Sequence, residues 1–84
     1  MNEETKSIMT NWLNNKICQK VEKNLEKWGL QTMNELLLAT MEELGELTRA
    51  YLRQRYEHGD QKEIDDELDD LAALIFQMKL RRCI

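Results

Sequence analysis

The stretch NELLLATMEELGEL, residues 34 to 47, decides the fold of this chain. Its apolar side chains recur at three- and four-residue spacing, which predicts an amphipathic α-helix. At about 100° per residue, Glu43 falls inside the apolar sector of that helix, and Glu46 lies at its margin. An unpaired buried carboxylate strongly destabilises a fold. The sequence therefore predicts that positive charge lies against Glu43 and Glu46.

Two further predicted helices flank the one that contains this stretch. All three have apolar residues at helical spacing, and residues that typically cap helices stand at their ends. Because the connections are short, neighbouring helices are expected to be antiparallel. The predicted helices run from about Thr5 to Lys27 with Gly29 as a left-handed cap, from a Thr32 N-cap to about Glu57, and from an Asp60 N-cap to about Arg81.

The predicted fold class is all-α, with three antiparallel helices in a single domain of residues 1–84. The apolar sectors of the helices are too broad for so small a chain to cover by itself. We therefore expect oligomerisation, as a homodimer or homotetramer, to complete a four-helix-like bundle.

The composition narrows the class of function. Hydrophobic residues make up 42% of the 84 residues and charged residues 33%, which is typical of a soluble helical protein. A net charge of −4 argues against a nucleic-acid-binding surface, which needs clustered Lys and Arg. No apolar run approaches the roughly 18 residues of a membrane span, and the N-terminus lacks the apolar core of a signal peptide. The expected location is the cytoplasm, with neither nucleic acid nor membrane as a partner.

The two cysteines, Cys18 and Cys83, follow no metal-binding spacing, so a zinc site is not expected. Two arrangements stay open from the sequence: one disulfide that joins the ends of the chain, or two small buried thiols. A reducing compartment favours the thiols.

In the third predicted helix, Glu67 and Asp70 lie at one edge of the apolar stripe, with Leu74 between them. The stripe itself consists of Ile64, Leu68, Leu71, Ile75 and Met78. No Lys or Arg lies in the corresponding sector of either acidic helix, so four facing carboxylates would need a bound cation. Oxygen-rich coordination suits Mg²⁺ or Mn²⁺ rather than zinc or copper. The alternatives are a polar helix interface and a solvated acidic face.

The two carboxylate pairs together resemble a known motif. Glu43-Leu-Gly-Glu46, twenty intervening residues and Glu67-Leu-Asp-Asp70 are similar to the ExxE…ExxD motif of the MazG-like nucleotide pyrophosphohydrolases, an all-α family. The flanking segments NELLLATMEELGEL and DELDDLAALIFQM also resemble that family. The resemblance covers about Trp28 to Met78, which is well over half of the chain.

The resemblance implies hydrolysis of a nucleoside or deoxynucleoside triphosphate between its α- and β-phosphates. The products would be the monophosphate and pyrophosphate, and the purpose would be the removal of unwanted nucleotides. It also implies that Glu43, Glu46, Glu67 and Asp70 bind Mg²⁺, or Mn²⁺ in its place. Glu46 is the candidate for orienting the attacking water or accepting its proton. The nucleotide pocket of that family lies between helices and is often completed by a second subunit.

Three further residues are candidates for substrate binding. Trp28 stands close to where some MazG-like proteins place an aromatic that stacks on the base, although a tryptophan at a helix end can equally be a packing residue. Asn34 is a candidate for hydrogen bonding to a base or sugar, and Arg82 for contact with phosphates. The alternatives are an unremarkable early-helix asparagine and a basic residue that suits the helix dipole.

Two departures from the MazG-like pattern bear on this interpretation. Asp69 stands where the family often has glycine, and the chain has no room for a full fourth helix after Ile84. A different class of function is a non-catalytic helical module for dimerisation or interaction. That hypothesis explains the helices and the surface charge, but it leaves Glu43 and Glu67 unexplained beside leucines.

Overall fold

The computed structural model describes residues 1–84, which form three helices and no strand. The first helix is continuous and contains a short π-helical segment, which the sequence did not predict. The predicted boundaries of all three helices are confirmed to within two residues. The elements are α1 (Glu3–Asn11), the π-helical segment η1 (Trp12–Ile17), α2 (Cys18–Trp28), α3 (Met33–Tyr56) and α4 (Gln61–Cys83).

The predicted caps are present at the ends of the helices. The Thr32 hydroxyl oxygen accepts a hydrogen bond from the backbone N–H of Glu35 at 3.2 Å. The Asp60 carboxylate accepts one from the backbone N–H of Lys62 at 2.9 Å. Gly29, just after α2, has a φ of 70°, a region that side chains with a Cβ disfavour. Local sequence therefore fixes where each helix begins and ends.

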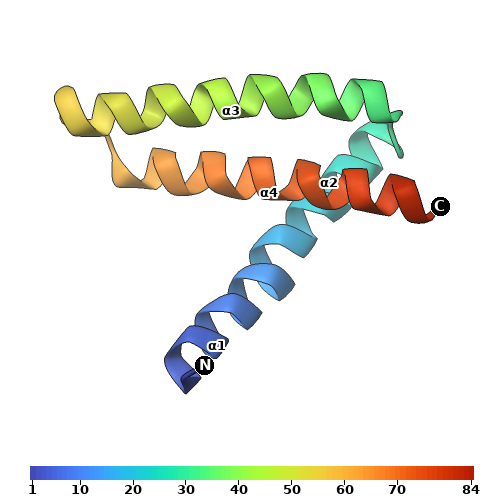
Figure 1. Ribbon diagram of the computed structural model, residues 1–84, viewed down its shortest axis with the longest axis horizontal. Coiled ribbons are helices and arrows are strands. Elements are labelled where there is room, and N and C mark those ends of the chain that lie inside the picture. The colour runs from blue at the N-terminus through green and yellow to red at the C-terminus, as the bar shows by residue number, and fades with distance from the viewer.

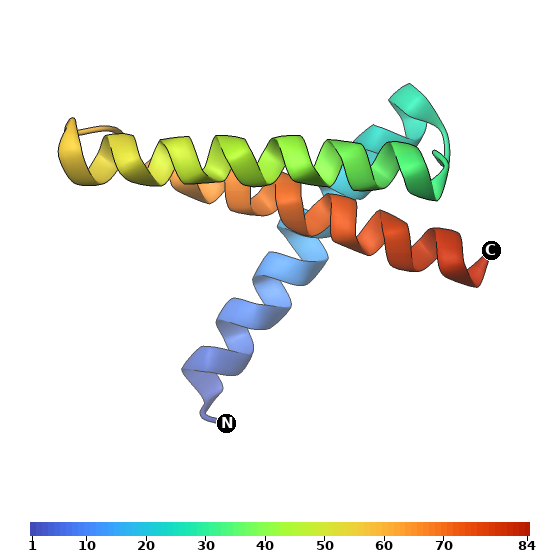
Figure 2. The ribbon, with the colours of Figure 1, turned by 45° about the horizontal axis from the view of Figure 1, so that its top comes forward.

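The helices α3 and α4 lie side by side and antiparallel, whereas the first helix crosses α4 obliquely (Figures 1 and 2). Both η1 and α2 pack against α4. In contrast, α1 contacts only η1, and it extends away from the other two helices. The expected antiparallel arrangement therefore holds for α3 and α4 but not for the first helix.

Small side chains on α4 explain why the first helix crosses it. Ile17 and Val21 pack against Ala73, which is completely buried, and Leu25 and Ala72 flank this cluster. Two adjacent alanines let the backbones approach closely at one point, and they offer no long apolar ridge for lengthwise packing. The contact between the first helix and α4 is therefore short.

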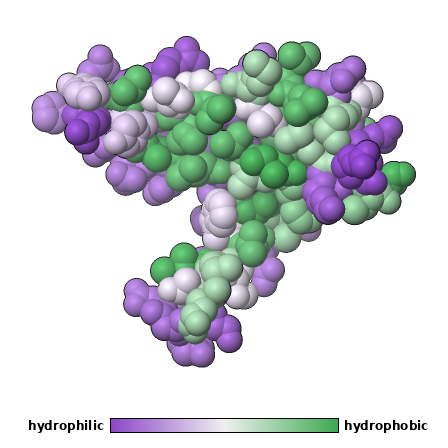
Figure 3. Space-filling view, viewed as in Figure 1, coloured by the Kyte–Doolittle hydropathy of each residue, from purple (hydrophilic) through white to green (hydrophobic).

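Much of the predicted apolar surface is left exposed. Only 8 of the 84 residues are buried, and α1 has no buried residue at all. Figure 3 shows hydrophobic side chains gathered where α2, α3 and α4 meet and continuing along part of α1. The exposed apolar side chains of α1 and α3 include Ile8, Met9, Leu37, Leu38, Met41, Leu44, Tyr51 and Leu52. No helix has the length and apolarity needed to cross a membrane.

The two cysteines do not form a disulfide. Cys18 and Cys83 are both free, and both are exposed. The expectation of buried thiols is therefore wrong. Cys18 lies just past the end of the π-helical segment, and Cys83 is the last helical residue of the chain, so neither side chain reaches the small core.

Candidate metal centre and adjoining pocket

The face of α3 that packs on α4 contains a carboxylate at its middle. Leu36 and Ala50 are completely buried on this face. Glu43 stands seven residues from each of them, and two helical turns bring a residue back to nearly the same side. The half-buried Glu43 therefore points toward α4 rather than toward solvent.

Three carboxylates meet between α3 and α4. One carboxylate oxygen from each of Glu43, Glu46 and Glu67 lies within 4.8 Å of the other two. All three side chains are half-buried. Glu43 Oε2 and Glu67 Oε2 are buried atoms with no hydrogen-bond partner in the chain. Buried polar atoms are nearly always hydrogen-bonded, so each of these two oxygens needs a proton, a water molecule or a ligand.

The surroundings of Glu43 disfavour a negative charge on its carboxylate. Burial, the neighbouring Glu67 carboxyl group, and the charges of Glu46 and Asp70 together raise the pKa of Glu43 from 4.5 to about 8. Each of these causes disfavours the charged form. Near neutral pH, the cluster therefore holds a proton unless a cation replaces it.

The three glutamates fit a hard divalent cation. Mg²⁺ binds oxygen at about 2.0–2.1 Å in octahedral geometry, so ligand oxygens on opposite sides of it are about 4.2 Å apart. One oxygen from each of Glu43, Glu46 and Glu67 lies within 4.8 Å of the others, so their separations are on the scale of that value. The orphaned oxygens supply the free lone pairs that coordination needs.

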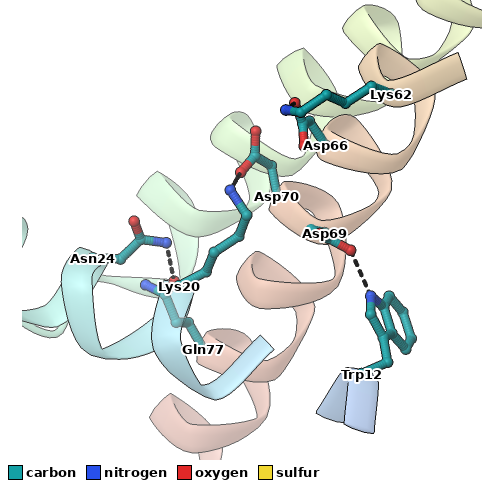
Figure 4. A network of polar contacts seen from close by, with 8 residues as sticks. All are labelled: Trp12, Lys20, Asn24, Lys62, Asp66, Asp69, Asp70 and Gln77. Carbon is teal, nitrogen blue, oxygen red and sulfur yellow. Dashed lines mark hydrogen bonds and ion pairs between the residues drawn. The ribbon is translucent and has the colours of Figure 1, made fainter. Parts of the chain in front are cut away.

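Asp70, the fourth predicted ligand, is held by a cation from the chain itself. Lys20 Nζ donates a hydrogen bond to Asp70 Oδ1 at 2.6 Å, and the two form an ion pair (Figure 4). This hydrogen bond raises the pKa of Lys20. The sequence prediction considered only Lys and Arg on the two acidic helices. It therefore missed Lys20, which reaches Asp70 from α2. A signal was available, because Lys20, Asn24 and Trp28 recur every four residues on one face of α2.

A pocket of about 370 Å³ adjoins the carboxylates where α2, α3 and α4 meet. Its lining combines two acids, two neutral amides and an aromatic ring. Trp28 is 60% exposed, and Lys27 Nζ lies 4.8 Å from the centre of its ring. The lining residues are Asn24, Trp28, Gln31, Ala39, Glu43, Asp70 and Leu74.

The remaining predicted site residues lie elsewhere. Asn34, in the first turn of α3, and Arg82, in the last turn of α4, are exposed and do not line the pocket. Asp69 accepts a hydrogen bond from the indole N–H of Trp12, on the side of α4 that faces the first helix (Figure 4). The structure thus brings Trp28, Glu43 and Asp70 into one pocket and leaves Asn34 and Arg82 outside it.

No protein-family model, curated protein or solved structure matches this chain. The function is therefore inferred from the carboxylate cluster, from the adjoining pocket and from the two carboxylate pairs of the sequence. The cluster lies between α3 and α4, and the adjoining pocket, which shares Glu43 with it, is also lined by α2.

Proposed function

We propose that this chain is a Mg²⁺-dependent nucleoside triphosphate pyrophosphohydrolase of the MazG-like kind. It would cleave a nucleoside or deoxynucleoside triphosphate to the monophosphate and pyrophosphate, and would thereby remove unwanted nucleotides. The observation that carries the proposal is the cluster of Glu43, Glu46 and Glu67, which has two buried oxygens without partners and opens beside an aromatic pocket. A purely structural polar interface would satisfy these oxygens with donors from the chain.

The four acids of the motif have distinct roles in this proposal. Glu43 and Glu67 hold the cation with their orphaned oxygens. Asp70 is the fourth ligand, so its ion pair with Lys20 opens when it takes up this role. The ammonium of Lys20 is then free to meet an anionic substrate. Glu46, whose carboxylate belongs to the same cluster, orients the attacking water or accepts its proton.

The chemistry of the cation and the shape of the pocket suit a triphosphate. When bound, Mg²⁺ neutralises phosphate charge and lowers the pKa of a coordinated water. Trp28 offers an aromatic surface on which the base can stack. Glu43 and Asp70 line the same pocket. Asn34 and Arg82 lie outside this pocket, so substrate contacts from them would have to be made at another surface.

A homodimer or homotetramer belongs to the proposal. Leu37, Met41, Leu44 and Tyr51 are exposed on α3, and their spacing alternates between four and three residues except for one polar position, Thr48. This spacing is the heptad pattern by which two helices pack along a seam. The proposed location is the cytoplasm, where nucleoside triphosphates are present and where the free Cys18 and Cys83 would stay reduced.

The direct test is pyrophosphate release from a panel of ribo- and deoxyribonucleoside triphosphates in the presence of Mg²⁺. We expect at least one substrate to be cleaved, and we expect Glu43→Gln to lower kcat/KM by about 100-fold or more. Asp66→Asn is the matched control, because Asp66 pairs with Lys62 on the exposed surface of the same helix as Glu67. Equal losses in both variants would contradict the assigned site.

The exposed apolar surface favours a second candidate, a non-catalytic module for dimerisation or interaction. The observation that favours this module is that α1 has no buried residue. The two candidates differ in one outcome. If folded protein with Mg²⁺ releases no pyrophosphate from any triphosphate, and sedimentation shows a stable oligomer that Leu44→Glu disrupts, the module is the better account.

A further inference from the structure

A pair of carboxamides, Asn24 and Gln77, adjoins the pocket, and neither belongs to the carboxylate cluster. Gln77 on α4 is completely buried, which is unusual for so polar a side chain. Its Oε1 accepts a hydrogen bond from Asn24 Nδ2 on α2 at 2.8 Å. Asn24 lines the pocket together with Trp28, Glu43 and Asp70. The buried member of the pair thus anchors the member that faces the pocket.

The pair is not satisfied within the chain. Gln77 Nε2 is buried and has no hydrogen-bond partner, which destabilises the fold. An apolar residue of the same size would avoid this penalty. We therefore look for a role of Gln77 other than stabilising the helix crossing. Its hydrogen bond with Asn24 indicates that role.

The contact with Gln77 fixes the orientation of the Asn24 amide. One N–H of Asn24 Nδ2 is engaged by Gln77 Oε1, which holds Nδ2 toward Gln77, and the acceptor Oδ1 points away from Gln77 (Figure 4). Without the buried partner, the Asn24 amide could turn by 180° and present either a donor or an acceptor. Of the two amides that line the pocket, Asn24 and Gln31, Asn24 is the one on the same helix face as Trp28 and the one held by a buried partner.

We propose that Asn24 determines base specificity, accepting a hydrogen bond from the exocyclic amino group of a base stacked on Trp28, and that Gln77 is its positioning residue. This inference rests on the proposed function for the class of ligand. Cytosine and adenine carry an amino group at the position where uracil and hypoxanthine carry a carbonyl oxygen. The amino-bearing base of each matched pair is therefore the preferred one, because a carbonyl would face the Asn24 oxygen without a proton between them.

The test compares two matched pairs of substrates, CTP with UTP and ATP with ITP, in pyrophosphate release. For the wild type we expect kcat/KM to favour the amino-bearing base by about tenfold or more in at least one pair. Asn24→Ala should reduce this ratio to within about threefold. Gln77→Met should reduce it too, and it should raise kcat/KM for the disfavoured base, because the freed amide can then offer its donor. A merely structural role for Gln77 would lower both values together.

A binding measurement keeps the inference separate from the proposed activity. Calorimetry with CMP and UMP, and with AMP and IMP, reports base preference in the absence of metal and of any reaction. If no triphosphate is cleaved but CMP or AMP binds in preference to its partner and Asn24→Ala removes the preference, base recognition stands and the activity fails. Asn15→Ala is the control, because Asn15 forms a comparable amide pair with Asn11 outside the pocket. Equal binding within both pairs, or a preference that survives Asn24→Ala, overturns the inference.

Discussion

Two groups of acids in this chain differ in their partners. Glu43, Glu46 and Glu67 lie together between α3 and α4, and two of their oxygens are buried without a partner. Four further acids, all on α4, each contact a donor from the chain. Those contacts are Arg53 with Glu63, Lys62 with Asp66, Trp12 with Asp69 and Lys20 with Asp70.

The difference between the two groups teaches which acids require a ligand. Glu67 of the first group lies within the same acidic run of α4 as the second group, so local composition does not distinguish it from them. An acid with a donor on an exposed face is satisfied, and its pairing contributes little to stability. An acid that faces other acids in a half-buried interface lowers stability until a cation or a proton arrives. Substitutions in the two groups should therefore have different consequences.

The largest expected effect is stabilisation by metal. At a concentration 100-fold above its Kd, Mg²⁺ or Mn²⁺ would add about 2.7 kcal/mol to the free energy of unfolding. For a chain of this size that corresponds to a rise in Tm of roughly 10 °C or more. Glu67→Gln should abolish the shift, whereas Asp69→Asn should retain it. Thermal unfolding followed by circular dichroism, with NaCl at matched ionic strength, measures both. A rise no greater than that with NaCl would contradict the metal site.

The next effect is the pH dependence of the metal-free protein. The pKa of Glu43 is 4.5 ordinarily and about 8 in the fold, so between these values the folded chain holds a proton that the unfolded chain has lost. The free energy of unfolding contributed by Glu43 is therefore full below pH 4.5 and falls as the pH rises toward 8. We expect the Tm to decrease over this range and Glu43→Gln to flatten the decrease. A Tm that rises steadily with pH in the wild type would exclude this proton.

A smaller effect is expected at the ion pair that borders the cluster. Lys20→Met removes the partner of Asp70, whose side chain is about a third exposed, so the Tm should fall by only a few degrees. The freed Asp70 can then serve the cation without first breaking an ion pair. The Kd for Mg²⁺, from titration calorimetry, should become tighter by up to about fivefold. Weaker binding would show that Lys20 supports the site rather than competing with it.

The smallest effect belongs to the exposed pair of Lys62 and Asp66. These residues are one helical turn apart on the surface of α4, and Lys62 Nζ lies 2.9 Å from Asp66 Oδ2. Lys62→Ala should change the Tm by no more than about 2 °C and leave the metal-induced shift intact. A large loss of either would mean that the two groups of acids are not independent.

A good part of the candidate site follows from helical periodicity. The periodicity places Glu43 inside the apolar sector of its helix, and the structure places it between the buried Leu36 and Ala50. The angular position of Glu67 was predicted less well. It was expected at the edge of the apolar stripe, but the buried face of α4 is centred near Glu67 and Leu74, while Leu68 and Ile75 are exposed. One helix shows which residues share a face, and only the neighbouring helix decides which face is covered.

The sequence by itself determined the three helices, their caps and the proximity of two carboxylate pairs to apolar surface. These features depend on backbone hydrogen bonding and on the helical repeat, which act over a few residues. The tertiary structure alone decided that Lys20 holds Asp70, that Gln77 holds Asn24 and that α1 extends without a partner. Each of these depends on the oblique crossing of the first helix over α4, where small side chains permit close approach. Contacts between residues fifty or more positions apart follow from that crossing and not from any local pattern.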